Sequence, residues 1–402
     1  MNKLLDEILK KIKPSKEEIS KVDTILNDLI NKIKISKAKV ELGGSGAKDT
    51  WLTNTNDIDL YVKFDFKTYN KKDISSILEK SLKKNFKIVR LHGSRDYFQL
   101  KQKGFTIEII PILNIKKVSE SKNITDISPF HVKFVKKNKK GDQIRLVKSF
   151  CKAQDCYGAE SYIKGFSGYV LEILTIKYGS FNNFIKNVSK WKDKKSIGDK
   201  NLIKKLNESK KEAPLILIDP VDPNRNAASA LNIENYNKLI KTSKAYLKKP
   251  SVKHFEKKEF SLDLLKNRYK NKKLIVLEVE PLKGKKDVIG AKLLKTLDYI
   301  AMKLKSNDFK LLKYDWVWNE KAILYYVLDK KLLLKNKEHQ GPPIKNKLAV
   351  ENFRKKWKNY KIKNNYTYVI VKRKFIDPKE FIKYLLKSDE HIKSMVRLVK
   401  FK

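Results

Sequence analysis

Cysteine and histidine are scarce in this sequence. Of 402 residues only two are cysteine, Cys151 and Cys156, and five are histidine. The cysteines lie close together on a helical pattern, which allows a disulfide, half of a metal site, or two reduced, half-buried thiols. The last interpretation is favoured because disulfides are rare in cytosolic proteins. Four histidines lack the spacing of metal ligands and receive no role: His92, His254, His339 and His391.

Long apolar runs are also absent. No run reaches the roughly 18 residues that a membrane-spanning helix needs, which argues against a transmembrane protein. The N-terminal residues have the pattern of an amphipathic helix and not of a signal peptide. No internal repeat or low-complexity tract stands out beyond a lysine bias. We therefore expect a cytoplasmic protein that does not act in a membrane.

Acidic residues are few relative to basic ones. The chain has 45 acidic and 92 basic residues and a formal net charge of +47. A field this positive favours a polyanionic partner, nucleic acid first, although a lysine-biased proteome also explains part of the charge. A membrane surface is less favoured because the lysines are spread along the whole chain.

The length and an apolar content of 41% indicate two to four domains with buried cores. In the first 117 residues, helical periodicity alternates with strand-like alternation, which predicts a small α+β domain. The expected strands are 39–43, 57–64, 86–91, 96–101 and 105–112. Helices are expected over most of 1–38, where Ser15 and Glu18 form a capping-box signature, and over 72–85.

The rest of the chain divides into a helical part and a second mixed part. We expect helices over most of 142–190 and a boundary near Pro250, followed by alternating strands and helices. The last helix is expected at about 378–387. The predicted fold class is therefore α+β and multi-domain, with domains at 1–137, 138–250 and 251–402.

The most informative stretch is a glycine turn at residues 43–45 followed by two carboxylates. Asp57 and Asp59 are one strand-step apart, so their side chains point to the same face while Ile58 and Leu60 bury behind them. Adjacent carboxylates repel each other, and a bound cation relieves that repulsion. The stretch predicts a site for a metal–triphosphate complex.

A third acid is needed if two metal ions are used. Glu108 is the candidate, because it lies in a strand pattern with apolar neighbours on both sides, where an acid without a partner is costly. The alternative is a glutamate on an edge strand that faces water. Asp57 and Asp59 in the same predicted domain favour the first interpretation.

The turn, the Asp-x-Asp pair and the later acidic strand resemble the nucleotidyltransferase superfamily of DNA polymerase β. An ordered set of further motifs resembles the archaeal-type (class I) CCA-adding enzymes over nearly the whole chain. The motifs are Gly44-Ser45-Gly46-Ala47-Lys48-Asp49-Thr50-Trp51-Leu52, Ser128-Pro129-Phe130-His131, Tyr157-Gly158-Ala159-Glu160, Gly165-Phe166-Ser167-Gly168-Tyr169, Asp219-Pro220-Val221-Asp222-Pro223-Asn224-Arg225-Asn226 and Gly341-Pro342-Pro343.

The resemblance implies that six residues contact the nucleotide: Ser45, Lys48, His131, Lys148, Tyr157 and Arg225. Among them Ser45 and Lys48 would contact the triphosphate, with Lys48 as a point charge where many relatives have arginine. Arg225 would help to read the base, oriented by Asp222. Five of the six have a plainer alternative: a surface lysine for Lys48, a structural histidine for His131, a solvated helix face for Lys148, a core aromatic for Tyr157 and a stabilised turn around Arg225.

The resemblance further implies metal ligation by Asp57, Asp59 and Glu108, with Mg²⁺ as the cofactor. It implies a template-independent transferase that builds or repairs the 3′-terminal CCA of tRNA with CTP and ATP. A poly(A) polymerase or oligoadenylate-type transferase, and a non-catalytic RNA-binding protein on the same scaffold, are the alternatives. The sequence does not determine the oligomeric state, and the resemblance allows a homodimer formed through the C-terminal regions.

Overall fold

The computed structural model describes residues 2–402, which form two compact units that divide between residues 258 and 259. Each unit contains both helices and strands, and the predicted α+β, multi-domain class is confirmed. None of the described helices is both long and apolar enough to cross a bilayer.

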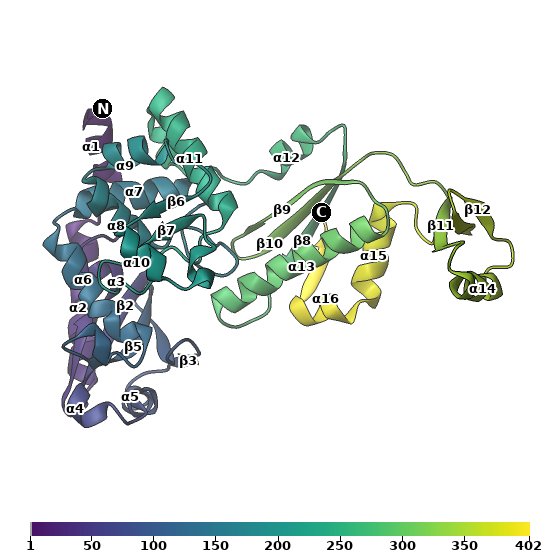
Figure 1. The fold of residues 1–402 in the computed structure, drawn as a ribbon. Helices are drawn as coiled ribbons and strands as arrows, with labels where there is room; N and C mark the ends of the chain where they lie inside the picture. Colours follow the sequence, from purple (N-terminus) through teal and green to yellow (C-terminus); the bar gives the residue numbers. More distant parts are fainter. Residues whose placement is uncertain (1) are drawn as a thin grey trace. The chain divides into compact units, whose positions relative to one another are not determined.

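The N-terminal unit begins with two helices and a five-stranded sheet (Figure 1). The strand order is β1-β2-β5-β4-β3; β2 and β5 are parallel, and the other neighbours are antiparallel. All five strands lie where the alternation predicts them. The elements of this part are α1 (Asn2–Ile12), α2 (Lys16–Lys32), β1 (Ala38–Leu42), α3 (Gly44–Ala47), β2 (Asp57–Asp65), α4 (Phe66–Tyr69), α5 (Ile74–Leu82), β3 (Val89–Leu91), β4 (Tyr97–Gln102) and β5 (Phe105–Asn114).

The core of this part lies between the sheet and its helices. Ile58 and Leu60 of β2 are buried, as predicted, and pack with Ile25 of α2 and Leu78 of α5. The predicted capping box at the start of α2 is present: Ser15 accepts a hydrogen bond from the Glu18 N–H, and the Glu18 carboxylate accepts one from the Ser15 N–H. This packing holds the β2 backbone rigid where its first residues face the turn at 43–45.

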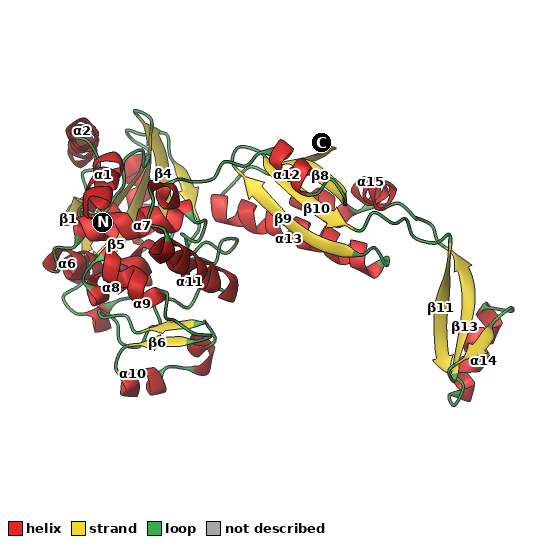
Figure 2. Ribbon diagram, turned by 90° about the horizontal axis from the view of Figure 1, so that it is seen from above, coloured by secondary structure: helices red, strands yellow, loops and turns green. Residues whose placement is uncertain are grey.

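The second part of the N-terminal unit is mainly helical. In Figures 1 and 2, α7, α8 and α9 gather together with α1, and their shared core includes Phe150, Leu171 and Phe184. Two short strands, β6 and β7, pair in parallel. The elements are α6 (Ser128–Lys137), α7 (Gly141–Ala153), α8 (Gly168–Tyr178), α9 (Phe181–Val188), β6 (Lys195–Ile197), α10 (Lys200–Lys205), β7 (Leu215–Leu217) and α11 (Ile233–Lys248), with short 3₁₀ turns at Val118–Glu120, Ile124–Ile127, Glu208–Lys211 and Val252–Phe255.

The C-terminal unit contains a four-stranded sheet of order β14-β8-β10-β9 and a three-stranded sheet of order β11-β13-β12. Figure 2 shows α13 along β9 and β10, and α14 beside β11. The helix predicted at about 378–387 is present as α15, but it is not the last helix, because α16 follows it. The elements are α12 (Leu262–Arg268), β8 (Lys273–Glu280), α13 (Lys286–Ser306), β9 (Leu311–Trp318), β10 (Ala322–Leu328), β11 (Asn336–Pro343), α14 (Lys347–Lys356), β12 (Lys361–Lys363), β13 (Tyr366–Lys372), α15 (Pro378–Ser388), α16 (Glu390–Met395) and β14 (Leu398–Phe401).

The two cysteines are separate thiols. Cys151, near the end of α7, and Cys156, in the loop that follows, are both buried and free. The Cys156 thiol donates a weak hydrogen bond of 3.5 Å to the Cys151 carbonyl. Burial raises the pKa of the Cys151 thiol. Both side chains are fully buried and behave as small apolar groups in the core.

Candidate active site

The three predicted metal ligands lie on two neighbouring strands. Asp57 opens β2, and Asp59 stands directly beside Glu108 in the parallel register of β2 and β5. Residues paired in this register, and residues two apart on one strand, point to the same face of the sheet. On the other side of Glu108, Gln99 of β4 donates a hydrogen bond of 3.3 Å to its carboxylate. The sheet therefore brings Asp59 and Glu108 side by side, with Asp57 at the strand end.

The glycine turn fits closely around Asp59. The Gly43 N–H donates a hydrogen bond of 2.7 Å to the Asp59 carbonyl. Gly44 has φ +52°, and a Cβ atom on it would lie 1.7 Å from Asp59 Oδ2. Only glycine meets both requirements, the left-handed backbone and the close approach of the carboxylate. The predicted turn thus shapes the site through its missing side chain.

The environment of Asp59 disfavours a bare negative charge. Burial raises the pKa of Asp59, the neighbouring Asp57 raises it further, and the attraction of Lys48 and Lys148 does not cancel these effects. A divalent cation would reverse the balance, and carboxylate oxygens are the donors that Mg²⁺ prefers. Across residues 2–402, however, no three His, Cys, Asp or Glu side chains converge closely enough to form a ready metal cluster.

Lys48, a predicted triphosphate contact, and Lys148, a predicted nucleotide contact, meet on one buried carboxylate. Lys48 follows α3, Lys148 lies on α7, and their Nζ atoms are 2.8 and 2.7 Å from the two oxygens of Glu172 on α8. Thr50 Oγ1 donates to Glu172 at 3.0 Å and accepts from Lys148 at 2.9 Å. Lys48 is therefore not one of many surface lysines. The solvated-face alternative for Lys148 is wrong, because its side chain is only 4% exposed.

A second buried carboxylate, Asp219, contacts Arg225, the predicted base-reading residue. It is fully buried, and Arg225 donates to its Oδ2 at 3.3 Å. His131 Nε2 lies 3.4 Å from the same oxygen, an ion-pair distance without the geometry of a hydrogen bond. Tyr169 donates to Oδ1 at 2.8 Å. Although burial opposes it, His131, the Val221 N–H and Tyr169 hold the pKa of Asp219 below its ordinary value.

The predicted role of Asp222 is corrected by this arrangement. The side chain that contacts Arg225 is Asp219, whereas Asp222 accepts a hydrogen bond from the Arg225 N–H through its main-chain carbonyl. Asp222 shapes the loop, because its side chain also accepts from the Asn224 N–H. Asp219 orients the guanidinium.

Tyr169 connects the two carboxylate clusters. Its ring stacks on His131 with centroids 4.0 Å apart, and Lys48 Nζ lies 5.0 Å from its centre. Tyr157 lies close to Lys148, because a Cβ on Gly168 would approach Tyr157 Oη to 2.9 Å and Lys148 Cε to 3.6 Å. Five of the six predicted nucleotide contacts thus occupy one connected region of the N-terminal unit.

The sixth predicted contact, Ser45, lies in α3 one residue after Gly44. Its main-chain carbonyl accepts a hydrogen bond from the Thr50 N–H, which closes the turn. Because Asp59 packs on Gly44, Ser45 lies next in sequence to the point where turn and carboxylate meet.

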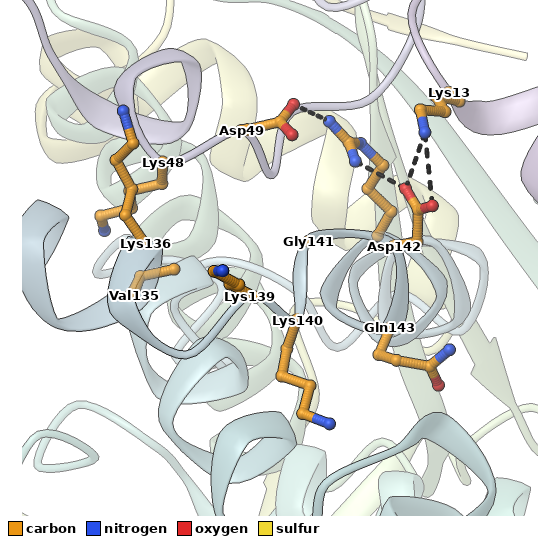
Figure 3. Close-up of a pocket in the computed structure, with 11 residues that line it drawn as sticks. Lys13, Lys48, Asp49, Val135, Lys136, Lys139, Lys140, Gly141, Asp142 and Gln143 are labelled. Atoms are coloured by element: carbon orange, nitrogen blue, oxygen red, sulfur yellow. Dashed lines mark hydrogen bonds and ion pairs between the residues drawn. The ribbon is translucent and has the colours of Figure 1, made fainter.

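A basic pocket of about 500 Å³ opens beside this region (Figure 3). Its acids are already neutralised: Arg145 pairs with Asp49 and Asp142, and Lys13 lies 3.3 Å from Asp142. The ring of charged groups therefore keeps a positive surplus, which suits an anionic ligand. The charged side chains that line it are Lys13, Lys48, Asp49, Lys136, Lys139, Lys140, Asp142 and Arg145.

Comparison with known proteins bears on the whole chain. Three family descriptions match in order: a nucleotidyltransferase domain at residues 19–142, the second domain of tRNA nucleotidyltransferase at 142–256, and the C-terminal domain of CCA-adding enzyme at 271–398. The CCA-adding enzyme of Nanoarchaeum equitans is 38% identical over 342 residues, covering 82% of this chain and 83% of that protein. This chain belongs to the CCA-adding enzymes.

Other relatives agree. The CCA-adding enzyme of Pyrobaculum aerophilum is 30% identical over 399 residues, covering 94% of this chain and 91% of that protein. That of Methanosarcina barkeri is 31% identical over 372 residues, covering 87% and 80%. The resemblance inferred from the motifs is confirmed, as is the prediction of a nucleotidyltransferase.

A solved structure supports the same fold at low identity. The crystal structure of the Cid1 poly(U) polymerase matches with a TM-score of 0.51 and 14% identity, over 64% of this chain and 98% of that one. At this identity the match concerns the fold alone.

For this CCA-adding enzyme, sequence reasoning missed Glu172, Asp219 and Tyr169 as site residues. Glu172 carried a usable signal, because it is the one acid in the mostly apolar helix Gly168–Tyr178. Like Glu108, Glu172 is an acid among apolar neighbours, and a buried acid needs a partner. Asp219 and Tyr169 stood inside quoted motifs, but nothing in their local pattern showed that they meet.

Proposed function

We propose that this CCA-adding enzyme builds and repairs the 3′-terminal CCA of tRNA from CTP and ATP without a template. The 3′-hydroxyl oxygen of the tRNA attacks the α-phosphate in line, forms the new P–O bond and displaces pyrophosphate. The main support is the register that sets Asp59 beside Glu108, next to a turn whose Lys48 meets Lys148 on one carboxylate.

Lys48 and Lys148 would bind the triphosphate. Their ammonium groups lie within hydrogen-bonding distance of the same carboxylate, so they form one cationic pair. Ser45 would add a hydroxyl contact from the turn, in line with the family resemblance. Neutralising the phosphates favours departure of pyrophosphate, because negative charge accumulates on it in the transition state.

Nucleotidyl transfer in this superfamily is generally metal-dependent, and we assign Mg²⁺ to Asp57, Asp59 and Glu108. The donor chemistry fits, since all three provide hard carboxylate oxygens. The pKa of Asp59 is raised by burial and further by the negative charge of Asp57. When bound, Mg²⁺ would lower the pKa of the attacking hydroxyl and stabilise the leaving pyrophosphate.

Arg225, His131 and Tyr157 would position the nucleoside. Arg225 presents several donors in a fixed fork, and its contact with Asp219 restricts how that fork turns. The side chain is 35% exposed, which leaves donors for a base edge. His131 stacks on Tyr169, and the aromatic body of Tyr157 suits packing against a ribose.

We assign catalysis to residues 1–137, nucleotide and tRNA binding to 138–250, and grip on the tRNA top half to 251–402. The net charge of +47 supports binding through phosphates and A-form shape. Affinity for tRNA should then fall steeply with salt, by more than about tenfold between 50 and 200 mM for several phosphate contacts. Salt-independent binding in a filter assay would contradict this assignment.

We also propose a cytoplasmic location and a homodimer. Two buried free thiols suit a reducing cytoplasm. A homodimer through the C-terminal region follows from the resemblance alone, and light scattering of the purified chain measures it directly.

One assay tests the proposed function. The enzyme is incubated with Mg²⁺ and tRNA lacking its CCA end, with CTP and ATP singly and together. Addition of two C residues followed by one A is the expected result. A run of A residues would instead indicate a poly(A) or oligoadenylate-type transferase, and no addition would indicate a non-catalytic RNA-binding protein.

A further inference from the structure

Glu172 is a buried acid that the proposed reaction does not use directly. It lies in the middle of α8, whose sequence GYVLEILTIKY contains no other acidic residue, and it is 1% exposed. A carboxylate in such a place is stable only with partners of opposite charge. Both oxygens have one: Oε1 accepts from Lys148 at 2.7 Å, and Oε2 accepts from Lys48 at 2.8 Å.

The two lysines reach Glu172 from different parts of the chain. Lys48 lies 124 residues before it, beside the turn of the five-stranded sheet, and Lys148 lies 24 residues before it on α7. Two ammonium groups this close repel each other unless an anion stands between them. Thr50 closes the arrangement, because its hydroxyl accepts from Lys148 and donates to Glu172. The geometry therefore depends on the charge of Glu172.

The arrangement leaves binding capacity for phosphate oxygens. An ammonium group carries three N–H donors. Among the contacts of the described residues, Lys48 Nζ donates to Glu172 and lies over the ring of Tyr169, and its side chain retains 11% exposure. Two cations and one anion leave one net positive charge, held at a fixed place beside the catalytic turn.

We propose that Glu172 is the positioning residue of the triphosphate site: it holds Lys48 and Lys148 together so that both charges meet the incoming nucleotide. This inference rests on the proposed triphosphate role of the two lysines. Glu172 itself touches no reacting atom. Because Glu172 already holds the two mutually repelling lysines together, nucleotide binding need not supply that free energy. Loss of Glu172 should therefore weaken the binding of ATP and CTP alike.

The pH dependence of nucleotide binding offers an independent readout. Burial lowers the pKa of Lys148, and Glu172 opposes that effect. Lys48 and Lys152 also lower the pKa of Lys148, and Asp59 interacts with it. Tyr61, Tyr157 and Tyr169 are further titratable groups that interact with the charge of Glu172. Without Glu172, Lys148 should lose its proton at lower pH, so the rise of KM for ATP at alkaline pH should begin earlier.

The test compares Glu172→Gln, Glu172→Asp and the control Glu208→Gln. Glu208 also pairs with a lysine at 2.7 Å, but its side chain is 88% exposed. Glu172→Asp keeps the buried charge and shortens its reach, so it tests the proposal if Glu172→Gln does not fold. KM for ATP, CTP and tRNA, kcat, and the Kd of ATP without tRNA are measured for each across pH 6–9.

The expected result for Glu172→Gln is a rise of about tenfold or more in KM and Kd for both nucleotides, with a smaller change in kcat and none in KM for tRNA. For Glu172→Gln, the rise of KM for ATP at alkaline pH should begin at a lower pH than in the wild type. Glu172→Asp should show a smaller rise in KM, and the control Glu208→Gln should match the wild type. Folded Glu172 variants with unchanged nucleotide KM, or a parallel loss for tRNA, would overturn the proposal. A wild-type enzyme that binds neither nucleotide would instead refute the proposed function itself.

Discussion

Glu172 and Asp59 are two carboxylates of the same structural unit whose surroundings shift their pKa values in opposite directions. Burial would raise the pKa of Glu172, but Lys148 and Lys48 outweigh it and hold the pKa below its ordinary value. At Asp59, burial raises the pKa and Asp57 adds to it, while the same two lysines, acting only by Coulomb attraction, do not compensate.

The difference distinguishes a carboxylate whose charge is balanced by protein groups from one whose charge needs a bound cation. Glu172 accepts three hydrogen bonds from protein donors, so its charge is part of the folded structure. Asp59 stands among other acids, so its charge raises the energy of the apo protein and becomes favourable with a cation. Carboxylates with perturbed pKa values are common at the functional sites of enzymes.

The largest expected effect separates the two carboxylates by activity. Asp59→Asn removes a predicted metal ligand and should lower nucleotide addition by at least about a thousandfold, since metal stabilisation of the transition state is worth several kcal/mol. Binding of tRNA should persist. Primer-extension rates measure nucleotide addition, and filter binding measures tRNA binding. The control is Asp23→Asn, on the exposed face of α2. If Asp59→Asn turned over like the wild type, the assignment of Asp59 as a metal ligand would be wrong.

The next effect concerns stability at Glu172. Glu172→Gln leaves Lys148 buried with a cationic neighbour, and breaking a buried pair costs about 3 kcal/mol or more. Because the folded pKa of Glu172 is lowered, its stabilisation is full above the unfolded pKa of about 4.3 and is lost as pH falls through the folded value. Urea unfolding should therefore show a large loss at pH 7 that shrinks toward pH 3. A loss independent of pH would contradict the charge argument.

A substitution in the turn should disturb Asp59 without touching its charge. Gly44→Ala places a Cβ 1.7 Å from Asp59 Oδ2 on a backbone with φ +52°. We expect activity to fall more than about tenfold, with a loss of about 1–3 kcal/mol in stability. The matched control is Gly104→Ala, because Gly104 also has positive φ (+82°) but nothing within 4 Å of the added Cβ. Equal effects at both positions would show that backbone strain alone is responsible.

The smallest effect has the opposite sign to that at Glu172. Since the folded pKa of Asp59 is raised, its ionised form destabilises the metal-free protein above the unfolded pKa, and the penalty disappears as pH falls. Asp59→Asn should thus stabilise the metal-free enzyme at pH 7 by about 1.4 kcal/mol for each unit of raised pKa. The gain should vanish near pH 3. Urea unfolding in a chelator measures it, and destabilisation at pH 7 would refute the difference between the two carboxylates.

Much of the fold was predictable because it rests on local periodicity. The alternation of Ile58 and Leu60 with Asp57 and Asp59 defined both faces of β2, and the pattern around Glu108 placed it on a strand of the same sheet. The short strands β6, β12 and β14 and the late helix α16 went unpredicted, because segments this short show no usable periodicity.

By itself, the sequence determined the strands of the five-stranded sheet, the turn, the family and the residues that it shares with that family, because backbone geometry and motif order can be read in one dimension. Only the tertiary structure decided that Lys48 and Lys148 share Glu172, and that Asp219 and not Asp222 orients Arg225. The physical reason is that a buried charge must find its partner wherever packing brings one. Partners 24 or 124 residues apart leave no periodic trace in the chain.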